Sequence, residues 1–171
     1  MTSEKRREII VTDLKRSDTP LTGAFLAKQY QVSRQIIVQD VAILRAAGHD
    51  IIATPQGYLM PKVNQHQRMT RVFAVKHSQN DIEDELNTIV DYGGKILDVI
   101  IEHPVYGEFK TRLMLSTRND VKAYLDVMKK EEAEPLSALT EGVHLHTIEA
   151  DSITILNEIE KILEQKGYLL K

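Results

Sequence analysis

The order of short helical segments and a hairpin in the first 60 residues leaves few folds open to this chain. Residues 3–16 are predicted to form a helix that Ser3 can cap. Thr22 can cap a second, short helix, and Ser33 can cap a third helix, which ends at Gly48. The sequence therefore predicts three helices in close succession, separated by tight polar connections.

In the third predicted helix, Ile37, Val41 and Leu44 lie at i, i+4 and i+7, so they are predicted to form its buried side. Two short apolar runs follow within residues 49–60, and the turn-rich segment between them suits a small hairpin. Three helices followed by a hairpin predict a winged helix-turn-helix domain over residues 1–61.

The outward side of the third helix carries side chains that can read DNA bases. A helix-turn-helix places this helix in the major groove, with its N-terminal residues at the base edges. Arg34 can chelate guanine, Gln35 and Gln39 can chelate adenine, and Val38 can meet a thymine methyl group. Ser33 and the first backbone N–H groups can hold a phosphate. These five residues are predicted DNA contacts; the alternative is a three-helix packing module with a solvated polar face.

Charge is divided unevenly along the chain, although the whole carries only −3. Residues 1–66 hold 9 Lys and Arg against 6 Asp and Glu, a balance of +3. Residues 67–171 hold 13 against 19, a balance of −6. A basic first part and an acidic remainder fit a DNA-contacting head on an acidic body.

The composition also narrows the class of protein. The chain has no cysteine, which excludes disulfides and thiolate metal sites, so any metal would need His, Asp or Glu ligands. The first residues are not followed by an apolar stretch of the signal-peptide kind. The longest apolar runs, such as Val99–Ile101, are far too short to cross a membrane. We therefore expect a cytoplasmic protein with no membrane partner.

After a polar linker at residues 62–69, the chain alternates strands and helices in a second domain, residues 70–171. The order β-α-β-β-α-β-α-β is typical of an α+β sandwich with helices on one face of a mostly antiparallel sheet. Strands are predicted at residues 71–77, 95–102, 109–115, 143–149 and 168–170, and helices at 81–92, 117–131 and 152–166.

Histidines form the sharpest local signal in this second domain. His144 and His146 are two residues apart in a predicted strand, so both imidazoles point to the same face and can reach one metal. His77 ends another strand, and the acidic residues 83–85 follow at the start of a helix. Three imidazoles and a carboxylate suit Zn, Ni, Fe or Mn better than Ca or Mg. The alternative is a solvent-facing pair of histidines and a helix start that favours acidic residues through its dipole.

Both domains resemble known bacterial families. The first resembles the winged helix-turn-helix type found at the front of biotin-ligase repressors, through Leu26-Ala27, Val32-Ser33-Arg34, Leu44-Arg45, Gly48 and Gly57-Tyr58. The second resembles the 3H domain, through His77 with its acidic helix, His103 to Gly107, and His144 to Thr147. The two domains in this order resemble the niacin-responsive repressors of NAD biosynthesis.

This resemblance implies a repressor that binds operator DNA better when nicotinic acid, or a close relative, is bound as corepressor. It also implies a metal at His77, Glu85, His144 and His146. The chemistry of these ligands favours a divalent transition metal, first of all Ni or Zn and otherwise Fe or Mn. Glu83 and Asp84 are near enough to take the place of Glu85, so the carboxylate stays open. A homodimer on a palindromic operator is expected, because paired recognition helices must lie about 34–36 Å apart to meet successive major grooves.

Three further residues are predicted to bind the small ligand. His103 and Tyr106 flank the turn at Pro104 and can line a pocket, and Arg112 or Lys110 can pair with a ligand carboxylate. The alternative for each is structural: a His-Pro turn, a packed tyrosine and solvent-facing strand charges.

Two other functions compete with a niacin-responsive repressor. In a metal-responsive regulator the DNA-binding head is the same and the metal itself is the signal. In a small metal-dependent hydrolase the histidine cluster would be catalytic, but only Glu141 and Glu149 lie near the His144–His146 strand as candidate bases. We therefore do not expect an enzyme, and the second domain is too short for a biotin ligase.

Overall fold

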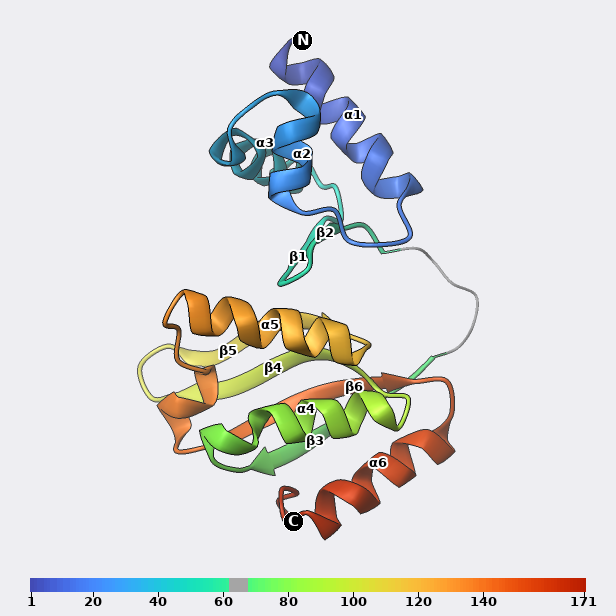
Figure 1. Ribbon diagram of the computed structural model, residues 1–171, viewed down its shortest axis with the longest axis vertical. Helices are drawn as coiled ribbons and strands as arrows, with labels where there is room; N and C mark the ends of the chain where they lie inside the picture. The colour runs from blue at the N-terminus through green and yellow to red at the C-terminus, as the bar shows by residue number, and fades with distance from the viewer. Residues whose placement is uncertain (62–67) are drawn as a thin grey trace. The chain divides into compact units, whose positions relative to one another are not determined.

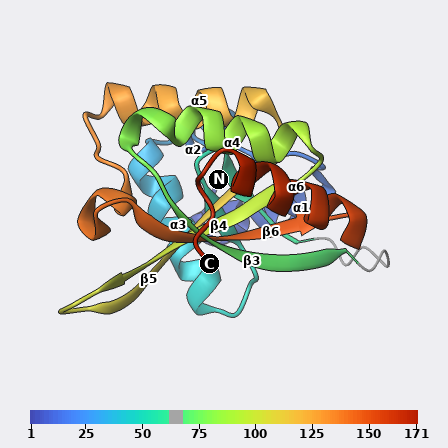
Figure 2. The same cartoon turned by 90° about the horizontal axis from the view of Figure 1, so that it is seen from below.

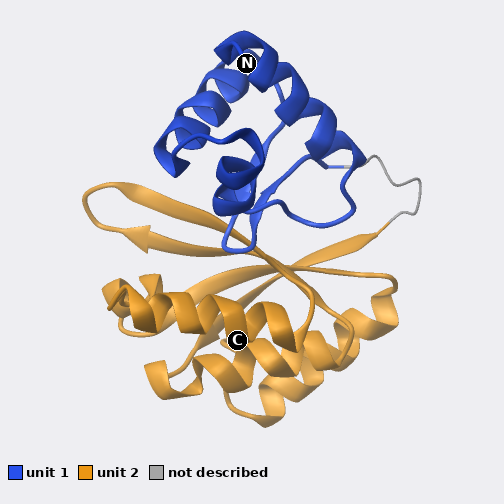
Figure 3. Ribbon diagram, turned by 45° about the horizontal axis from the view of Figure 1, so that its top comes forward, with its two compact units in different colours: residues 1–64 blue, residues 65–171 orange. Residues whose placement is uncertain are grey.

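The computed structural model describes residues 1–61 and 68–171, and its chain forms two compact units, Met1–Asn64 and Gln65–Lys171 (Figure 1, Figure 3). The linker predicted at 62–69 lies mostly outside the described residues, and Met69, its last residue, is already the first residue of a strand. Among the described residues, no helix is both long and apolar enough to span a membrane.

Unit 1 is a winged helix-turn-helix, as predicted. Three helices are followed by an antiparallel hairpin. Leu21, which precedes the second helix, forms a single antiparallel β-bridge with Tyr58 of this hairpin. The elements are α1 (Ser3–Arg16), α2 (Gly23–Tyr30), α3 (Arg34–Ala46), β1 (Ile52–Thr54) and β2 (Gly57–Leu59).

The helix starts follow the predicted caps except at the first helix. The side chains of Thr22 and Ser33 accept hydrogen bonds from backbone N–H groups of α2 and α3, which confirms both caps. The cap of α1 is Thr2, so the prediction of Ser3 was wrong by one residue. Thr2 keeps an extended backbone and accepts the N–H of Lys5, which leaves Ser3 as the first helical residue.

The predicted stripe of α3 forms the centre of the unit 1 core. Ile37 is fully buried, and Val41 and Leu44 are nearly so. They pack with Ile10 of α1 and Leu26 of α2 in one apolar cluster. This packing fixes which side of α3 is left facing solvent.

Unit 2 contains one four-stranded antiparallel sheet, in the order β3-β6-β4-β5. Helices α4, α5 and α6 all cover the same face of this sheet (Figure 2). The bounds are β3 (Met69–Lys76), α4 (Ile82–Asp91), β4 (Lys95–His103), β5 (Gly107–Leu115), α5 (Arg118–Lys130), β6 (Val143–Ala150) and α6 (Ile153–Gln165), with short 3-10 helices η1 (Gln79–Asp81) and η2 (Leu136–Thr140).

The strand predicted at 168–170 is reduced to a single bridge, in which Leu169 faces Val75 of β3. Two backbone hydrogen bonds of 2.8 Å, from Lys76 N to Tyr168 O and from Leu170 N to Ala74 O, flank this bridge. The segment follows α6 directly, so it contacts β3 over too few residues to form a ladder of its own.

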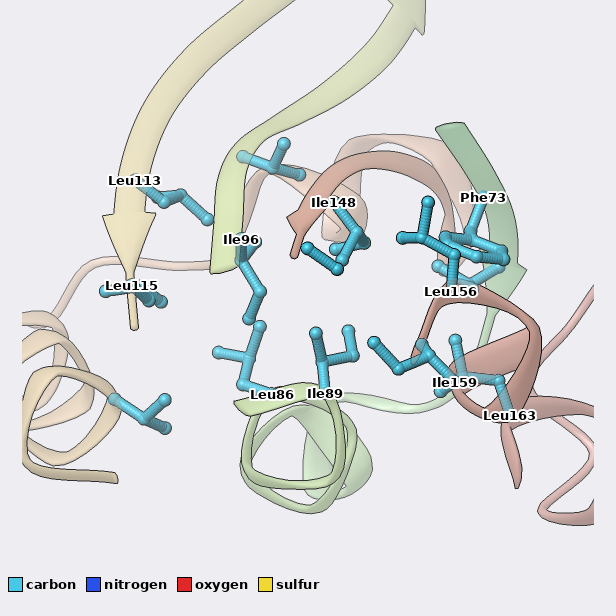
Figure 4. Close-up of a cluster of buried hydrophobic side chains, with 14 residues drawn as sticks. Phe73, Leu86, Ile89, Ile96, Leu113, Leu115, Ile148, Leu156, Ile159 and Leu163 are labelled. Carbon is cyan, nitrogen blue, oxygen red and sulfur yellow. The ribbon is translucent and has the colours of Figure 1, made fainter. Parts of the chain in front are cut away.

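The core of unit 2 lies between the sheet and its helices (Figure 4). Ile96 and Ile148 from the sheet meet Leu86 and Ile89 of α4, and Leu156 of α6 closes the layer. On β6, residues alternate between this layer and the other face, and His144 and His146 share the inward face with Ile148. The two histidines therefore lie in the buried layer of the domain.

The wing depends on Gly57, and we expect Gly57→Ala to loosen it. Gly57 has φ +129°, and a Cβ there would lie 2.6 Å from the carbonyl oxygen of Leu21. Strain of about 1–3 kcal/mol should raise hydrogen exchange at the Leu21 and Tyr58 amides by about tenfold or more. These two amides bond each other's carbonyl groups, so their exchange measured by NMR reports the wing directly.

Gly48→Ala is the matched control for this variant. Gly48 also has a positive φ, +91°, but a Cβ there would meet nothing within 4 Å. The control carries backbone strain without the clash and should leave exchange at both wing amides unchanged. Equal effects of the two variants on those amides would contradict this account.

Candidate functional site

The solvent-facing side of α3 carries the predicted DNA contacts. Ser33, Arg34, Gln35 and Gln39 are exposed, and Val38 is partly buried. Their placement agrees with the face that the helix leaves free, although contact with DNA stays a prediction for each of these residues. Ser33 already accepts the N–H of Ile36 as the cap of α3, so its hydroxyl group serves the helix start.

A buried ion pair attaches α3 to α1 from behind. Arg6 Nε lies 2.5 Å from Asp40 Oδ2, and the two residues are only 7% and 3% exposed. Arg7 adds a longer contact of 3.4 Å to the other carboxylate oxygen. Removing one member of such a pair leaves an unpaired buried charge, so loss of either side chain is expected to destabilise the packing of α3 on α1.

In unit 2, four of the histidine and acidic side chains named above come together. His77 follows the last residue of β3, and Glu85 lies in the first turn of α4. His144 and His146 face the same layer from β6, in register with Val75 and Phe73 of β3. Three elements far apart in the sequence therefore meet at one buried point.

The geometry centres on one carboxylate oxygen. Glu85 Oε2 lies 2.6 Å from His77 Nε2, 3.4 Å from His144 Nε2 and 3.6 Å from His146 Nε2. All four side chains are almost completely buried. Among the described residues, the second oxygen of Glu85, Oε1, has no hydrogen-bond partner although it is buried. His77, Glu85 and His144 each offer one nitrogen or oxygen atom, and these atoms lie within 4.8 Å of one another. A metal ion could be held at this spacing.

The second nitrogen of each imidazole is fixed by a backbone carbonyl. His77 Nδ1 lies 2.8 Å from Ser78 O, His144 Nδ1 lies 2.9 Å from Gly142 O, and His146 Nδ1 lies 2.6 Å from Asp98 O. A carbonyl oxygen only accepts, so each Nδ1 must carry the proton. The three Nε2 atoms are therefore directed at Glu85. Each Nε2 presents a lone pair when its imidazole is neutral and donates a hydrogen bond when its imidazole is charged.

The electrostatics of the cluster call for positive charge at its centre. Burial opposes ionisation of Glu85, but the charge of His146 and hydrogen bonds from the three histidines hold the pKa of its carboxyl well below the usual value. Burial likewise lowers the pKa of His77 and His146, and the Glu85 carboxylate outweighs it, so both pKa values are raised. Either Nε2 protons or a metal ion can supply the positive charge.

The neighbouring acidic residues of α4 are placed elsewhere. Asp84 accepts hydrogen bonds from Lys166 Nζ at 2.7 Å and from Tyr168 Oη at 2.8 Å. Glu83 is exposed. Of the three carboxylates that the sequence left open, only Glu85 reaches the histidines.

A small pocket, with a cavity volume of about 30 Å³ and partly open to solvent, adjoins the cluster. Glu85, His144 and His146 contribute to its lining, while Tyr124 and Ser137 are its other polar residues. Leu, Ile, Val and Pro side chains make the remaining wall, and no Lys or Arg lines it among the described residues. The walls are apolar in character, but the cavity has room for no more than a few water molecules. An anionic group bound here would find no Lys or Arg as its partner among the described residues.

The three predicted ligand contacts lie outside this pocket. His103 ends β4, and its Nδ1 accepts the N–H groups of Val105 and Tyr106, which stabilises the turn into β5. The ring of Tyr106 stacks on His103 at 5.0 Å and is 74% exposed. Arg112 is exposed on β5. The structure does not bring these residues to the histidine cluster, and their role in ligand binding stays a prediction.

The sequence pattern missed several residues of the site. Asp98 supplies the carbonyl that holds His146, and a carboxylate inside the apolar run 96–101 was an unused signal of a buried polar contact. Tyr124 lies on the face of α5 that packs toward the core, and its spacing does not distinguish it from an ordinary packed residue. Ser137 belongs to η2, whose short 3-10 turns have no periodic pattern to detect.

Comparisons with known proteins agree with this architecture. A family model for the 3H domain matches residues 70–171, and a model for a helix-turn-helix domain matches residues 6–59. A probable transcription repressor NiaR of Thermotoga maritima is 43% identical over 168 residues, covering 98% of this chain and 95% of that protein. The transcription repressor NadR of Bacillus subtilis is 42% identical over 168 residues, covering 97% and 93%.

The two relatives match nearly the whole chain, so these matches span both of its domains. They also agree with the predicted helix-turn-helix head, and the named relatives are repressors, not enzymes. The chain therefore belongs to the NiaR and NadR family and is a DNA-binding transcription repressor with a helix-turn-helix domain followed by a 3H domain.

Proposed function

We propose that this repressor binds a divalent transition metal at His77, Glu85, His144 and His146, and that nicotinic acid or a close relative is its corepressor. Its targets would be genes of NAD biosynthesis or niacin uptake. The observation that carries the metal proposal is the fixed orientation of three imidazoles, each bound through Nδ1 to a carbonyl and directed through Nε2 at one carboxylate. Metal-binding histidines almost always have such a partner on the second nitrogen.

The residues present fit a metal in chemistry as well as in position. Three imidazole nitrogens and a carboxylate oxygen favour Ni or Zn, with Fe and Mn as further possibilities. The unpartnered Oε1 of Glu85 leaves a buried acceptor that a cation would satisfy. When bound, the metal would supply positive charge and a coordination position for a carboxylate or ring nitrogen.

The lining of the adjoining pocket suits an aromatic acid in chemical character, and the cavity of about 30 Å³ would have to widen to admit one. Its apolar walls suit a pyridine ring, and Tyr124 and Ser137 provide hydroxyl groups for polar atoms. A carboxylate in this pocket would be costly without a cation, and no Lys or Arg lines the pocket among the residues described. Ligand binding is therefore expected to depend on the metal.

Corepression requires that the ligand favour one arrangement of the DNA-binding heads. We infer a homodimer on a palindromic operator, in which two α3 helices lie about 34–36 Å apart in successive major grooves. A ligand that prefers this arrangement shifts the population toward it by no more than its differential affinity.

The metal proposal predicts a specific loss in Glu85→Gln. Replacing the carboxylate removes the charge at the centre of the cluster, so Ni(II) affinity measured by calorimetry should fall by about 100-fold or more. Glu83→Gln is the matched control, since Glu83 is exposed in the same helical turn. Unchanged Ni(II) affinity in Glu85→Gln, or equal losses in both variants, would overturn the assignment.

The ligand proposal predicts metal-dependent binding of nicotinic acid. Calorimetric titration should show micromolar-range binding to the metal-loaded protein and none after chelation, because no Lys or Arg lines the pocket among the described residues and its two histidines are already directed at Glu85. The double variant His144→Ala, His146→Ala should behave like the chelated protein. If neither form binds nicotinic acid, the metal-responsive regulator becomes the better account of this repressor.

The DNA proposal predicts that Arg34→Ala and Gln35→Ala each cost about 1–3 kcal/mol of binding to an operator selected from random DNA. Binding to unrelated DNA should change less, because base contacts carry the specificity. Fluorescence anisotropy at one fixed salt concentration measures both affinities. Lys161→Ala, which removes a charge from α6, is the control. Nicotinic acid binding should be normal in all three variants.

A further inference from the structure

Asp98 is a buried carboxylate at the centre of the sheet. It lies on β4 between apolar residues and is 3% exposed. A buried charge is costly unless its oxygens are paired. Here Oδ1 accepts the backbone N–H of Thr147 at 3.0 Å, and Oδ2 lies 3.3 Å from Lys110 Nζ on β5. Both oxygens therefore have partners on the neighbouring strands.

The sheet is irregular where Asp98 lies. The pairing of β4 with β6 shifts between Ile96 and Ile100, and the pairing of β4 with β5 shifts between Ile96 and Asp98. In a regular ladder, carbonyl and N–H groups of β4 would bond the backbone of β6. In this segment the Asp98 side chain takes the Thr147 N–H, while the Asp98 carbonyl is directed at His146 Nδ1, 2.6 Å away.

His146 differs in this respect from the other two histidines. His77 and His144 bond carbonyls within two residues of themselves, at Ser78 and Gly142. The carbonyl that holds His146 belongs to another strand, 48 residues away in the sequence. The orientation of His146 therefore depends on how β4 is held against β6 at this irregular point.

We propose that Asp98 is a positioning residue for His146. Its carboxylate bonds Thr147, the residue after His146, and so fixes the irregular segment in which its own carbonyl binds the imidazole. This sets the proton on Nδ1 and directs Nε2 to Glu85. The inference rests on the proposed metal function, because its consequence is that His146 is already oriented to serve as the fourth metal ligand.

The test compares Asp98→Ala with Asp98→Asn in the full-length protein. Asp98→Ala should weaken Ni(II) binding by about 10–100-fold and change the visible absorption spectrum of bound Co(II), which reports ligand geometry. Asp98→Asn keeps an oxygen that can accept the Thr147 N–H, so it should restore most of the affinity and the wild-type spectrum. A merely structural role would not move the Co(II) spectrum of the folded protein.

Asp120→Ala is the matched control. Asp120 also accepts backbone N–H groups, from Ser116 at 2.8 Å and Thr117 at 3.0 Å, but it belongs to the capping box of α5, and among the described residues it has no contact with a histidine. Its loss should leave Ni(II) affinity and the Co(II) spectrum unchanged. If Asp98→Ala does not fold, Asp98→Ser takes its place, because the shorter side chain stops short of Thr147.

Wild-type affinity and spectrum in Asp98→Ala would overturn the proposal, while the loss in Glu85→Gln would still uphold the metal site. If the wild-type protein binds no metal, ¹⁵N NMR of the imidazoles decides instead. A hydrogen-bonded Nδ1 proton on His146 that is lost in Asp98→Ala supports the positioning role. The same proton retained in that variant refutes it.

Discussion

Unit 2 is organised around the convergence of three imidazole Nε2 atoms on one oxygen of Glu85. Burying a carboxylate is costly unless cationic partners surround it, so the surrounding elements must hold those partners accurately. The cluster therefore joins β3, α4 and β6 by a polar contact at the edge of the apolar core. The adjoining pocket takes its polar wall from the same residues.

Unit 1 uses the same principle with a different pair of charges. The Arg6 guanidinium and the Asp40 carboxylate are buried together, and their contact joins α1 to the recognition helix. Apolar packing by Ile37, Val41 and Leu44 fixes the rotation of α3, and the ion pair adds a directional contact to it. The predicted DNA-reading side chains are thus carried on a helix held by two independent kinds of interaction.

Local patterns were sufficient to predict most of the fold, but not the contacts that depend on tertiary structure. Strand alternation placed His144 and His146 on one face, and helical spacing placed the α3 stripe. The choice of Glu85 could have been made too, since it lies in the apolar stripe with Ile82 and Ile89 at i−3 and i+4. The irregular pairing at Asp98 has no local signature, because two neighbouring strands produce it together.

The position of two cluster residues on β6 limits how this domain can vary. β6 pairs on one side with β3 and on the other with β4, so its register is set twice. Inserting one residue before His144 within the strand would turn both imidazoles to the opposite face of the sheet. Insertions and deletions among members of this family should therefore occur in the connections, such as the turn between β4 and β5, and be absent from β6.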